Sequence, residues 1–240
     1  MKYLDLSFPT PALNVACDEA LLDWSEEGGD CEILRVWEPN QHFVVLGYAN
    51  QASLEVKRDR CREMHIPILR RCSGGGTVLQ GPGCLNYTLI LRVDASRPVS
   101  TIAEANAHIM GAHQRALASL LNKEVAIEGH TDLAIGGRKF SGNAQRRKRR
   151  FLLFHGSFLL DFDLSLIEHA LLLPSKQPVY RRNRSHLEFL MNLKLPADAI
   201  KRALRSAWSA NETLDRTPTA LIEQMAKEKY SQVEWTFRFP

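Results

Sequence analysis

Three consecutive glycines, Gly74–Gly76, stand between two segments that have the composition of β-strands. The segment before them is PILRR at residues 67–71, and the segment after them is CLNYTLILRV at 84–93. Glycine has no Cβ, so a ligand can lie directly on the loop backbone and accept hydrogen bonds from its N–H groups. The sequence therefore predicts a strand–loop–strand unit that binds an anionic ligand. A glycine-rich hairpin with a purely structural role is the alternative.

Two common nucleotide-binding motifs do not fit this loop. It lacks the Gly-Lys-Ser/Thr ending of a phosphate-binding loop, no helix is predicted directly after it, and the dinucleotide fingerprint is absent. Arg70 and Arg71 enter the loop from the preceding strand, where successive side chains point to opposite faces. We therefore expect one arginine to clamp a ligand anion through its two-pronged guanidinium and the other to pair elsewhere.

The remaining pattern predicts an α+β fold with mixed or mainly antiparallel sheets and surrounding helices. Strands are expected at residues 3–6, 32–38, 42–48, 67–71, 84–93, 124–128, 131–135, 138–145 and 151–161, and helices at 10–24, 54–64 and 102–121. Further helices are expected after Asp163. We expect a single domain over 1–240, with a strand-rich core over 1–162, a helical part over 163–230, and no separate C-terminal accessory domain.

A second cluster of small and polar residues lies in GHTDLAIGGRKFSGNAQ at 129–145. Its Gly-Gly pair between two apolar runs predicts a type I′ hairpin. Period-two alternation predicts that Lys139, Ser141, Asn143 and Gln145 share one face of the outgoing strand, where Gly142 allows close approach. An exposed edge-strand lysine is the alternative. His155, in the next strand, is expected to face the same cleft as Lys139.

Charge and cysteine content restrict the remaining function classes. The formal net charge of +4 is mild, and the basic run QRRKRR at 145–150 predicts a solvated hairpin tip that can steer an acidic partner. Nucleic-acid binding is less favoured, because no aromatic residues alternate with these arginines.

The 5 cysteines show no C-x-x-C spacing, and no metal-ligand spacing is found. No targeting or membrane-spanning segment is predicted, so we expect a cytoplasmic protein.

The ordered motifs RRCSGGGTVLQGPGCLNY, TDLAIGGRKFSGNAQ and FHGSFLLDFDL, with NVACDEALL upstream, resemble the lipoate–protein ligase branch of the biotin/lipoate ligase superfamily. The resemblance extends from about residue 14 to residue 163. It implies the catalytic-domain fold of that superfamily. It also implies a two-step reaction, in which ATP and lipoate, or octanoate, give an acyl-adenylate, and the acyl group then passes to a lysine of a carrier domain.

The resemblance also implies roles for individual residues. Lys139 is the catalytic lysine that contacts the acyl carbonyl and the phosphate. Asp132 and Gln80 lie near the nucleotide and its Mg²⁺. The acyl-adenylate site is implied to comprise Arg70, Arg71, Ser73, Gly74, Gly75, Gly76, Thr77, Ser141, Gly142, Asn143 and His155. The implied partners are lipoic acid, ATP and an acidic lipoyl carrier domain, without nucleic acid or membrane.

This chain departs from the ligase pattern in two places: Gln80 replaces a histidine, and GPGCLNY replaces the usual Asp-x-Gly-Asn continuation. Two alternatives to the ligase therefore stay open. Octanoyltransferases of the neighbouring branch use no ATP and, in some members, form a cysteine thioester, but the corresponding loop GHTDL at 129–133 has no cysteine. The other alternative is a family member that binds its ligand without catalysis.

The last residues, VEWTFRFP at 233–240, resemble the extended aromatic segment that leads to an accessory domain in many of these ligases. A separate accessory subunit could complete the site. We expect instead that the helical region at 196–230 covers it, because Ile200, Leu204 and Trp208 offer apolar positions at helical spacing.

Overall fold

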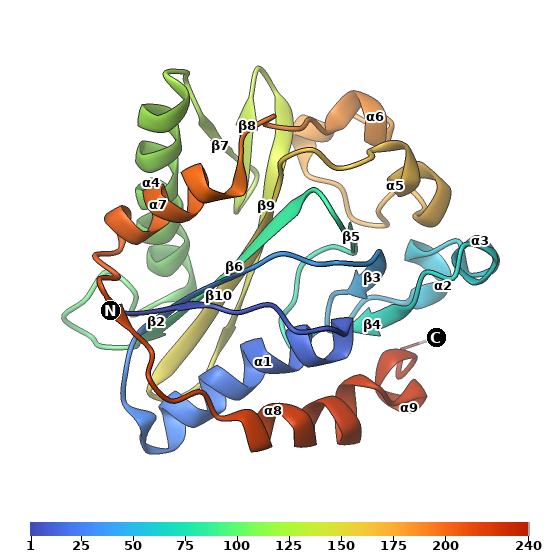
Figure 1. The fold of residues 1–240 in the computed structure, drawn as a ribbon. Coiled ribbons are helices and arrows are strands. Elements are labelled where there is room, and N and C mark those ends of the chain that lie inside the picture. The colour runs from blue at the N-terminus through green and yellow to red at the C-terminus, as the bar shows by residue number, and fades with distance from the viewer. Residues whose placement is uncertain (240) are drawn as a thin grey trace.

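The computed structural model describes residues 1–239 and shows two sheets with helices on both sides (Figure 1). The larger sheet has eight strands in the order β11-β1-β2-β6-β10-β9-β8-β7, and the smaller sheet has three in the order β4-β3-β5. The larger sheet comprises β11 (Glu212–Thr213), β1 (Lys2–Asp5), β2 (Ile33–Trp37), β6 (Cys84–Arg92), β10 (Phe151–Leu159), β9 (Arg138–Arg147), β8 (Asp132–Ile135) and β7 (Ala126–Glu128). The smaller sheet comprises β4 (Ile68–Arg70), β3 (Phe43–Leu46) and β5 (Val78–Gln80).

Strand direction makes both sheets mixed, as predicted. The strands from β2 through β6, β10, β9 and β8 to β7 pair antiparallel, whereas β1 pairs parallel with both β2 and β11. In the smaller sheet, β3 is parallel to β4 and antiparallel to β5. Residues 84–91 of β6 are all buried, which explains why this strand reads as a continuous apolar run.

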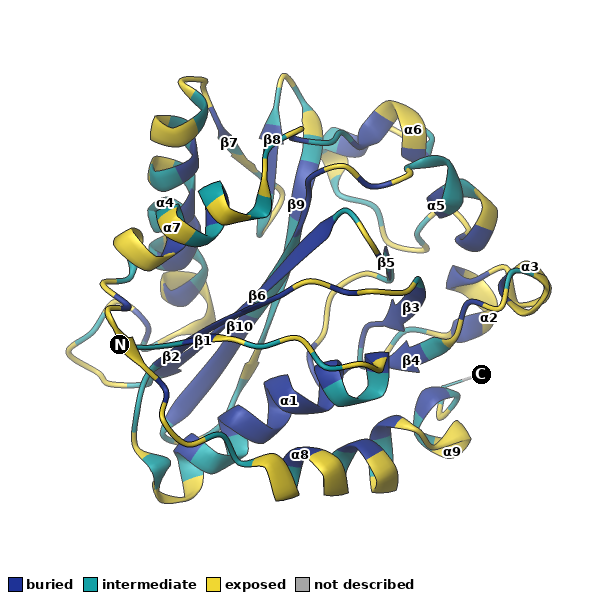
Figure 2. Cartoon of the chain, viewed as in Figure 1, coloured by how far each residue is buried: buried dark blue, intermediate teal, exposed yellow. Residues whose placement is uncertain are grey.

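The two faces of the larger sheet are covered by different helices (Figures 1 and 2). α4 (Ile102–Leu121) and α7 (Ala197–Ala207) cover one face, and α1 (Pro11–Trp24) covers the other, with α8 (Thr219–Met225) packed outside α1. The remaining helical segments are α2 (Ala52–Glu55), α3 (Arg58–Glu63), α5 (Ser165–Ala170), α6 (His186–Phe189), α9 (Val233–Thr236), η1 (Ser25–Gly29), η2 (Val179–Arg181) and η3 (Ala226–Tyr230).

Local sequence signals fix several of these elements. α4 begins with a capping box in which the Thr101 side chain accepts from the Glu104 N–H and the Glu104 carboxylate accepts from the Thr101 N–H. α1 is buried along most of its length because the sheet lies on one side and α8 on the other; its buried residues include Asp18 and Glu19.

Within residues 1–239, no helix combines the length and the apolar character that crossing a bilayer requires.

The structure confirms most predicted elements and corrects three. The single helix predicted at 54–64 is divided into α2 and α3, because Val56 is extended and forms a bridge with Leu171. β5 was not predicted, because three residues are too short to show alternation. The segment at 233–239, predicted to be extended, contains the helical turn α9; Pro240 lies outside the described residues.

Most of the helical region at 196–230 does not take the predicted position. α7 packs against α4, on the opposite face of the sheet from α1, and α8 with η3 packs against α1. The reason is that Ile200 and Leu204 complete the core beneath α4 rather than covering the glycine loop. By contrast, the Gly-Gly hairpin is confirmed: Gly136 and Gly137 have φ of 56° and 73°, the positive values that a type I′ turn needs.

Candidate functional site

The middle of the larger sheet is open to solvent at two interior strands. His155, Gly156 and Ser157 of β10 are partly exposed, as are residues 142–144 of the neighbouring β9, although most of the rest of β10 is buried. Interior strands of a sheet covered on both faces are normally buried throughout. This local exposure leaves an opening over β9 and β10, which we call the cleft.

The glycine loop forms a wall of this cleft. Gly75 has φ +85°, and a Cβ placed on it would lie 3.4 Å from Ala144 Cβ on β9 and 3.0 Å from Arg71 Nη2. Gly74 and Gly76 are exposed, and a Cβ on either would meet no heavy atom within 4 Å. The loop therefore rests on β9 at Gly75 and presents open backbone on either side of that contact.

Arg71 holds the glycine loop by hydrogen bonds to its backbone carbonyls. Its Nη2 donates to the carbonyls of Gly74 at 2.5 Å and Gly76 at 2.8 Å, and its Nε donates to Ser73 Oγ at 3.0 Å. Burial lowers the pKa of Arg71 to about 10, so the guanidinium stays cationic at neutral pH. The N–H groups of Gly74–Gly76 make no hydrogen bond within residues 1–239. With the carbonyls turned toward Arg71, these donors are available to an anion in the cleft.

Arg70 binds backbone carbonyls outside the glycine loop. It is fully buried and donates to the carbonyls of Gly47, Tyr48 and Asn50 at 2.8–2.9 Å and to the Thr236 carbonyl at 2.9 Å. Both guanidinium groups are engaged with protein acceptors, and the role of one of them as a clamp for a ligand anion stays a prediction. Both side chains hold backbone carbonyls.

A chain of hydrogen bonds joins the loop to α1 through His155. Its Nε2 lies 2.6 Å from Ser73 Oγ and its Nδ1 lies 2.9 Å from Asp18 Oδ2. The other Asp18 oxygen accepts from Arg35 Nη1 at 2.7 Å and Thr88 Oγ1 at 2.6 Å. Burial opposes ionisation of Asp18, yet its contacts with His155 and Arg35 lower its pKa below the ordinary value. This carboxylate orients His155, and His155 holds the start of the loop.

Lys139 lies at the β8–β9 end of the cleft. Its Nζ is 2.8 Å from Asp132 Oδ1, and Tyr180 OH donates to Asp132 Oδ2 at 2.8 Å. A Cβ on Gly142 would lie 2.7 Å from Lys139 Nζ, so the lysine side chain extends over that glycine. Burial and the Asp132 carboxylate raise the pKa of Tyr180, which keeps its phenol a hydrogen-bond donor across the ordinary pH range.

A β-bulge corrects the predicted face of β9. Leu133 pairs with Ser141 but Ala134 pairs with Lys139, which leaves one extra residue between them and moves Lys139 onto the face of Gly142. Ser141 lies within 3.5 Å of Asn143 Nδ2, and Asn143 in turn accepts from Tyr87 OH and contacts Met110 of α4. Gln145 bonds to Asn106, also of α4. Ser141, Asn143 and Gln145 therefore face α4 rather than the cleft.

Two other predicted residues lie beside the smaller sheet. Thr77 Oγ1 accepts from Asn50 Nδ2 at 3.0 Å, and Gln80 stands opposite Phe43 with its buried Oε1 unpaired within the described part of the chain. Across the larger sheet, both polar atoms of Asn86 and the Trp37 Nε1 are also buried without a partner in residues 1–239. Unpaired buried polar atoms are costly, so a bound ligand or ordered water is the expected partner.

Sequence reasoning missed three residues of this site. Asp18 was detectable, because DE at 18–19 interrupts an otherwise apolar helix face. Tyr180 and Asn86 gave no signal of their own: Tyr180 is 48 residues from Asp132, the group that it contacts, and Asn86 sits within a continuous buried strand.

Comparison with known proteins identifies the family. Residues 10–209 match the lipoyl protein ligase A/B catalytic domain. The chain belongs to that family. It is 24% identical to octanoyltransferase LipM of Bacillus subtilis, with 99% of this chain and 98% of that protein covered. It is 28% identical to a putative lipoate-protein ligase A of Aeropyrum pernix, with 93% and 87% covered.

Solved structures of the family share the fold. A lipoate-protein ligase A bound with ATP superposes with a TM-score of 0.83 at 24% identity, covering 100% of this chain and 99% of that one. The bipartite lipoate protein ligase of Thermoplasma acidophilum gives 0.84 at 24% identity, covering 100% and 96%. These structures confirm the predicted α+β architecture. The family match over residues 10–209 makes the chain an enzyme of the lipoate and octanoyl transfer family.

Proposed function

We propose that this protein activates lipoate, or octanoate, with ATP and transfers the acyl group to a lysine of an acidic lipoyl carrier domain. The observation that carries the proposal is the pairing of Lys139 with Asp132 over Gly142 in a cleft whose other wall is the glycine loop. A cation and several unbonded backbone N–H groups then surround one space, which suits an anionic acid and an anionic triphosphate.

In the first step, a carboxylate oxygen of the acid attacks the α-phosphorus of ATP, and pyrophosphate leaves. In the second, the neutral amine of the carrier lysine attacks the acyl carbon, AMP leaves with the electrons of the broken C–O bond, and the amine loses a proton. Lys139 and the loop amides stabilise the negative charge that builds up in both steps. Mg²⁺ bound with ATP would neutralise phosphate charge, and Asp132 is the cleft carboxylate suited to help hold it.

The second candidate is ATP-independent octanoyl transfer, which the relatives named octanoyltransferase favour. A thioester intermediate needs a reactive thiolate. Burial raises the pKa of Cys72 and of Cys84, the two cysteines that flank the glycine loop in sequence, to about 12. The other three cysteines also have raised pKa values, so none is prepared as a nucleophile. Burial therefore disfavours the thioester route of octanoyl transfer.

The deciding experiment incubates the purified chain with a lipoyl domain, lipoate and Mg-ATP and follows the mass of the lipoyl domain. Lipoylation that requires ATP supports the proposal. A parallel reaction supplies an octanoyl thioester carrier without ATP, and modification in that reaction alone would establish the transferase. Modification only from preformed lipoyl-adenylate, or only after a second polypeptide is added, would show that an accessory subunit performs or completes activation.

Tyr180 offers a test of how Lys139 is held. In Tyr180→Phe, Asp132 loses a hydrogen-bond donor, and the Asp132–Lys139 pair is less well fixed. A hydrogen bond to a charged group contributes about 1.5–3 kcal/mol, so we expect kcat for adenylate formation to fall by roughly tenfold or more. Pyrophosphate release measures the rate. Val179→Ala, at a neighbour that is 95% exposed, is the control expected to keep the wild-type rate.

A further inference from the structure

Three of the five basic residues in the hairpin tip are held by acceptors of the protein itself, two of them by carboxylates. Lys148 pairs with Asp23 at 2.7 Å, and Arg150 bonds to Asp30 and Glu26. Arg147 donates to the backbone carbonyls of residues 99–101. Only Arg146 and Arg149 in this run are exposed and have no carboxylate partner among residues 1–239. The tip as a whole is therefore not the basic patch that its sequence predicts.

Arg146 instead begins a row of alternating cations and aromatic rings. Its guanidinium carbon lies 5.9 Å from the centre of the Tyr48 ring, and that of Arg238 lies 5.1 Å from the same ring. Arg238 is also 4.9 Å from the Trp235 ring, and Lys229 Nζ is 4.2 Å from it. We call Arg146, Tyr48, Arg238, Trp235 and Lys229 the cation–aromatic row.

The row borders the glycine loop and is fixed to it by backbone contacts. The Tyr48 N–H donates to the Ser73 carbonyl at 2.8 Å, and Trp235 Nε1 donates to the Arg70 carbonyl at 2.8 Å. Arg146 Nη1 donates to the Cys72 carbonyl at 3.4 Å. Anything bound over Tyr48 therefore lies beside the loop that lines the cleft.

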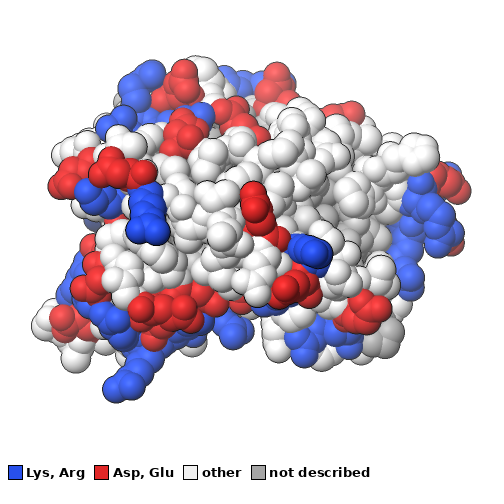
Figure 3. All heavy atoms as spheres, turned by 60° about the horizontal axis from the view of Figure 1, so that its bottom comes forward, with Lys and Arg blue, Asp and Glu red and all other residues white. Residues whose placement is uncertain are grey.

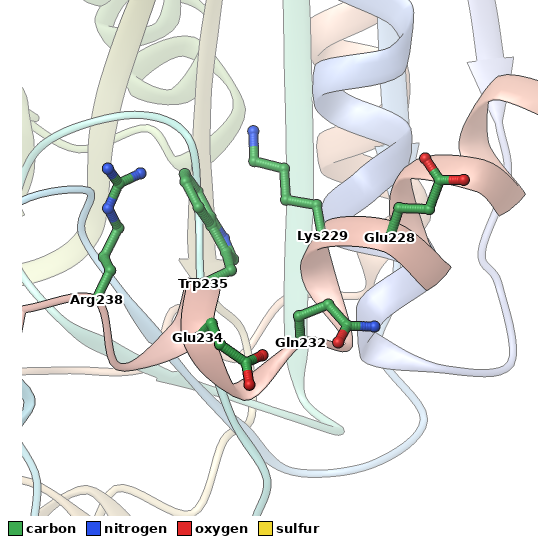
Figure 4. Close-up of a pocket in the computed structure, with 6 residues that line it drawn as sticks. All are labelled: Glu228, Lys229, Gln232, Glu234, Trp235 and Arg238. Carbon is green, nitrogen blue, oxygen red and sulfur yellow. The ribbon is translucent and has the colours of Figure 1, made fainter.

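One end of the row is hollowed. A cavity of about 490 Å³ is lined by Glu228, Lys229, Gln232, Glu234, Trp235 and Arg238. The side chains of Arg238, Trp235 and Lys229 extend side by side in the same direction (Figure 4). Lys229 is engaged by Glu19 at 2.5 Å, whereas Arg238 is exposed and has no carboxylate partner in the described part of the chain. Arg146 and Arg238, which both lie near the Tyr48 ring, are thus the available cations.

The surface charge of the protein is mixed on one face. On the face shown in Figure 3, Lys and Arg are interspersed with Asp and Glu around a wide neutral area rather than gathered into one basic field. Recognition of an acidic partner on a surface of this kind depends on local pairs of cations more than on net charge.

We propose that the acidic acceptor protein docks over Tyr48, with its carboxylates on Arg146 and Arg238, and so brings its target lysine to the glycine loop. This inference rests on the proposed function for the identity of the acceptor. Guanidinium groups match carboxylates with two parallel hydrogen bonds, and the rings beneath hold both arginines in place. Exposed pairs of this kind contribute mainly to the association rate, which is sensitive to salt.

The test reverses both charges in Arg146→Glu/Arg238→Glu. Transfer to a lipoyl domain, measured as kcat/KM for that domain, is expected to fall by about tenfold or more at low salt, and the difference from wild type is expected to shrink as salt is raised. Arg149→Glu is the matched control, because this exposed arginine lies on the same hairpin tip but makes no contact with Tyr48; it is expected to keep the wild-type rate.

Two further measurements keep the outcome decisive. Arg146→Lys/Arg238→Lys retains both positive charges. We expect it to keep most of the wild-type kcat/KM for the lipoyl domain at low salt. Direct titration of the acidic lipoyl domain into the protein without ATP tests docking even if lipoylation itself fails, which separates this inference from the proposed function. If Arg146→Glu/Arg238→Glu loses carrier-free pyrophosphate release to the same extent, the row belongs to nucleotide binding. If Arg149→Glu loses as much of the transfer rate, only the net charge of the protein matters. Either result overturns the proposal.

Discussion

Replacing Lys139 with alanine is expected to lower the rate of acyl-adenylate formation by about a hundredfold or more. The ammonium group lies over Gly142 and is fixed by Asp132 at 2.8 Å, so it is already oriented toward the cleft before substrates bind. A preorganised charge at a developing oxyanion contributes several kilocalories per mole, because no reorganisation is needed during the reaction. ATP-dependent pyrophosphate release with lipoate measures the effect.

The matched control is Lys194→Ala, which removes a lysine whose side chain is 68% exposed and which pairs with a surface carboxylate, Asp161. It is expected to keep the wild-type rate. Thermal unfolding of both variants establishes that the fold is retained. A folded Lys139→Ala protein that releases pyrophosphate at a near-normal rate would remove Lys139 from the chemistry.

Gly75→Val is expected to abolish detectable binding of the acyl substrate. Gly75 has φ +85°, a conformation that costs a β-branched residue free energy, and its Cβ would lie 3.0 Å from Arg71 Nη2 and 3.4 Å from Ala144 Cβ. The loop must then move away from Arg71, and its N–H groups lose the orientation that the carbonyl contacts impose. Titration calorimetry with lipoate, and with lipoate plus ATP, measures the loss.

Gly74→Ala is the comparison, because a Cβ at that position meets nothing within 4 Å and the backbone there does not have the strained φ. We expect it to bind lipoate within a few-fold of wild type. If the folded Gly75→Val protein binds lipoate with unchanged affinity, the loop has only a structural role.

The long periodic elements were predictable from sequence, because burial imposes their pattern. α4 covers the same residues as the predicted helix, and its capping box is visible in the sequence as Thr101 and Glu104. β6 and β10 read as apolar runs because they are interior strands. Short elements such as β5, and the interruption between α2 and α3 at Val56, depend on partners distant in sequence and leave no local pattern.

The sequence identified candidate site residues more readily than it predicted the direction in which their side chains point. Ser73 and His155 contact each other beside the glycine loop. Alternation alone placed Ser141 and Asn143 beside Lys139, and the bulge between Leu133 and Ala134 reverses that relation. Nor does a sequence show whether an arginine finds carbonyl acceptors within its own chain. Arg70 finds four such acceptors at 2.8–2.9 Å, in segments 20–23 and 166 residues away.

The contacts of Arg70 also limit the order in which parts of the structure can form during synthesis. β3, β4 and the glycine loop leave the ribosome long before residues 233–239 do. Until then, Arg70 lacks the Thr236 carbonyl, and its own carbonyl lacks the Trp235 indole. Nascent chains that have emerged only to residue 232 therefore lack two of the hydrogen bonds that hold the strand leading into the glycine loop. In the order of synthesis, a segment in the first third of the sequence gains these two contacts only after residues 235 and 236 have emerged.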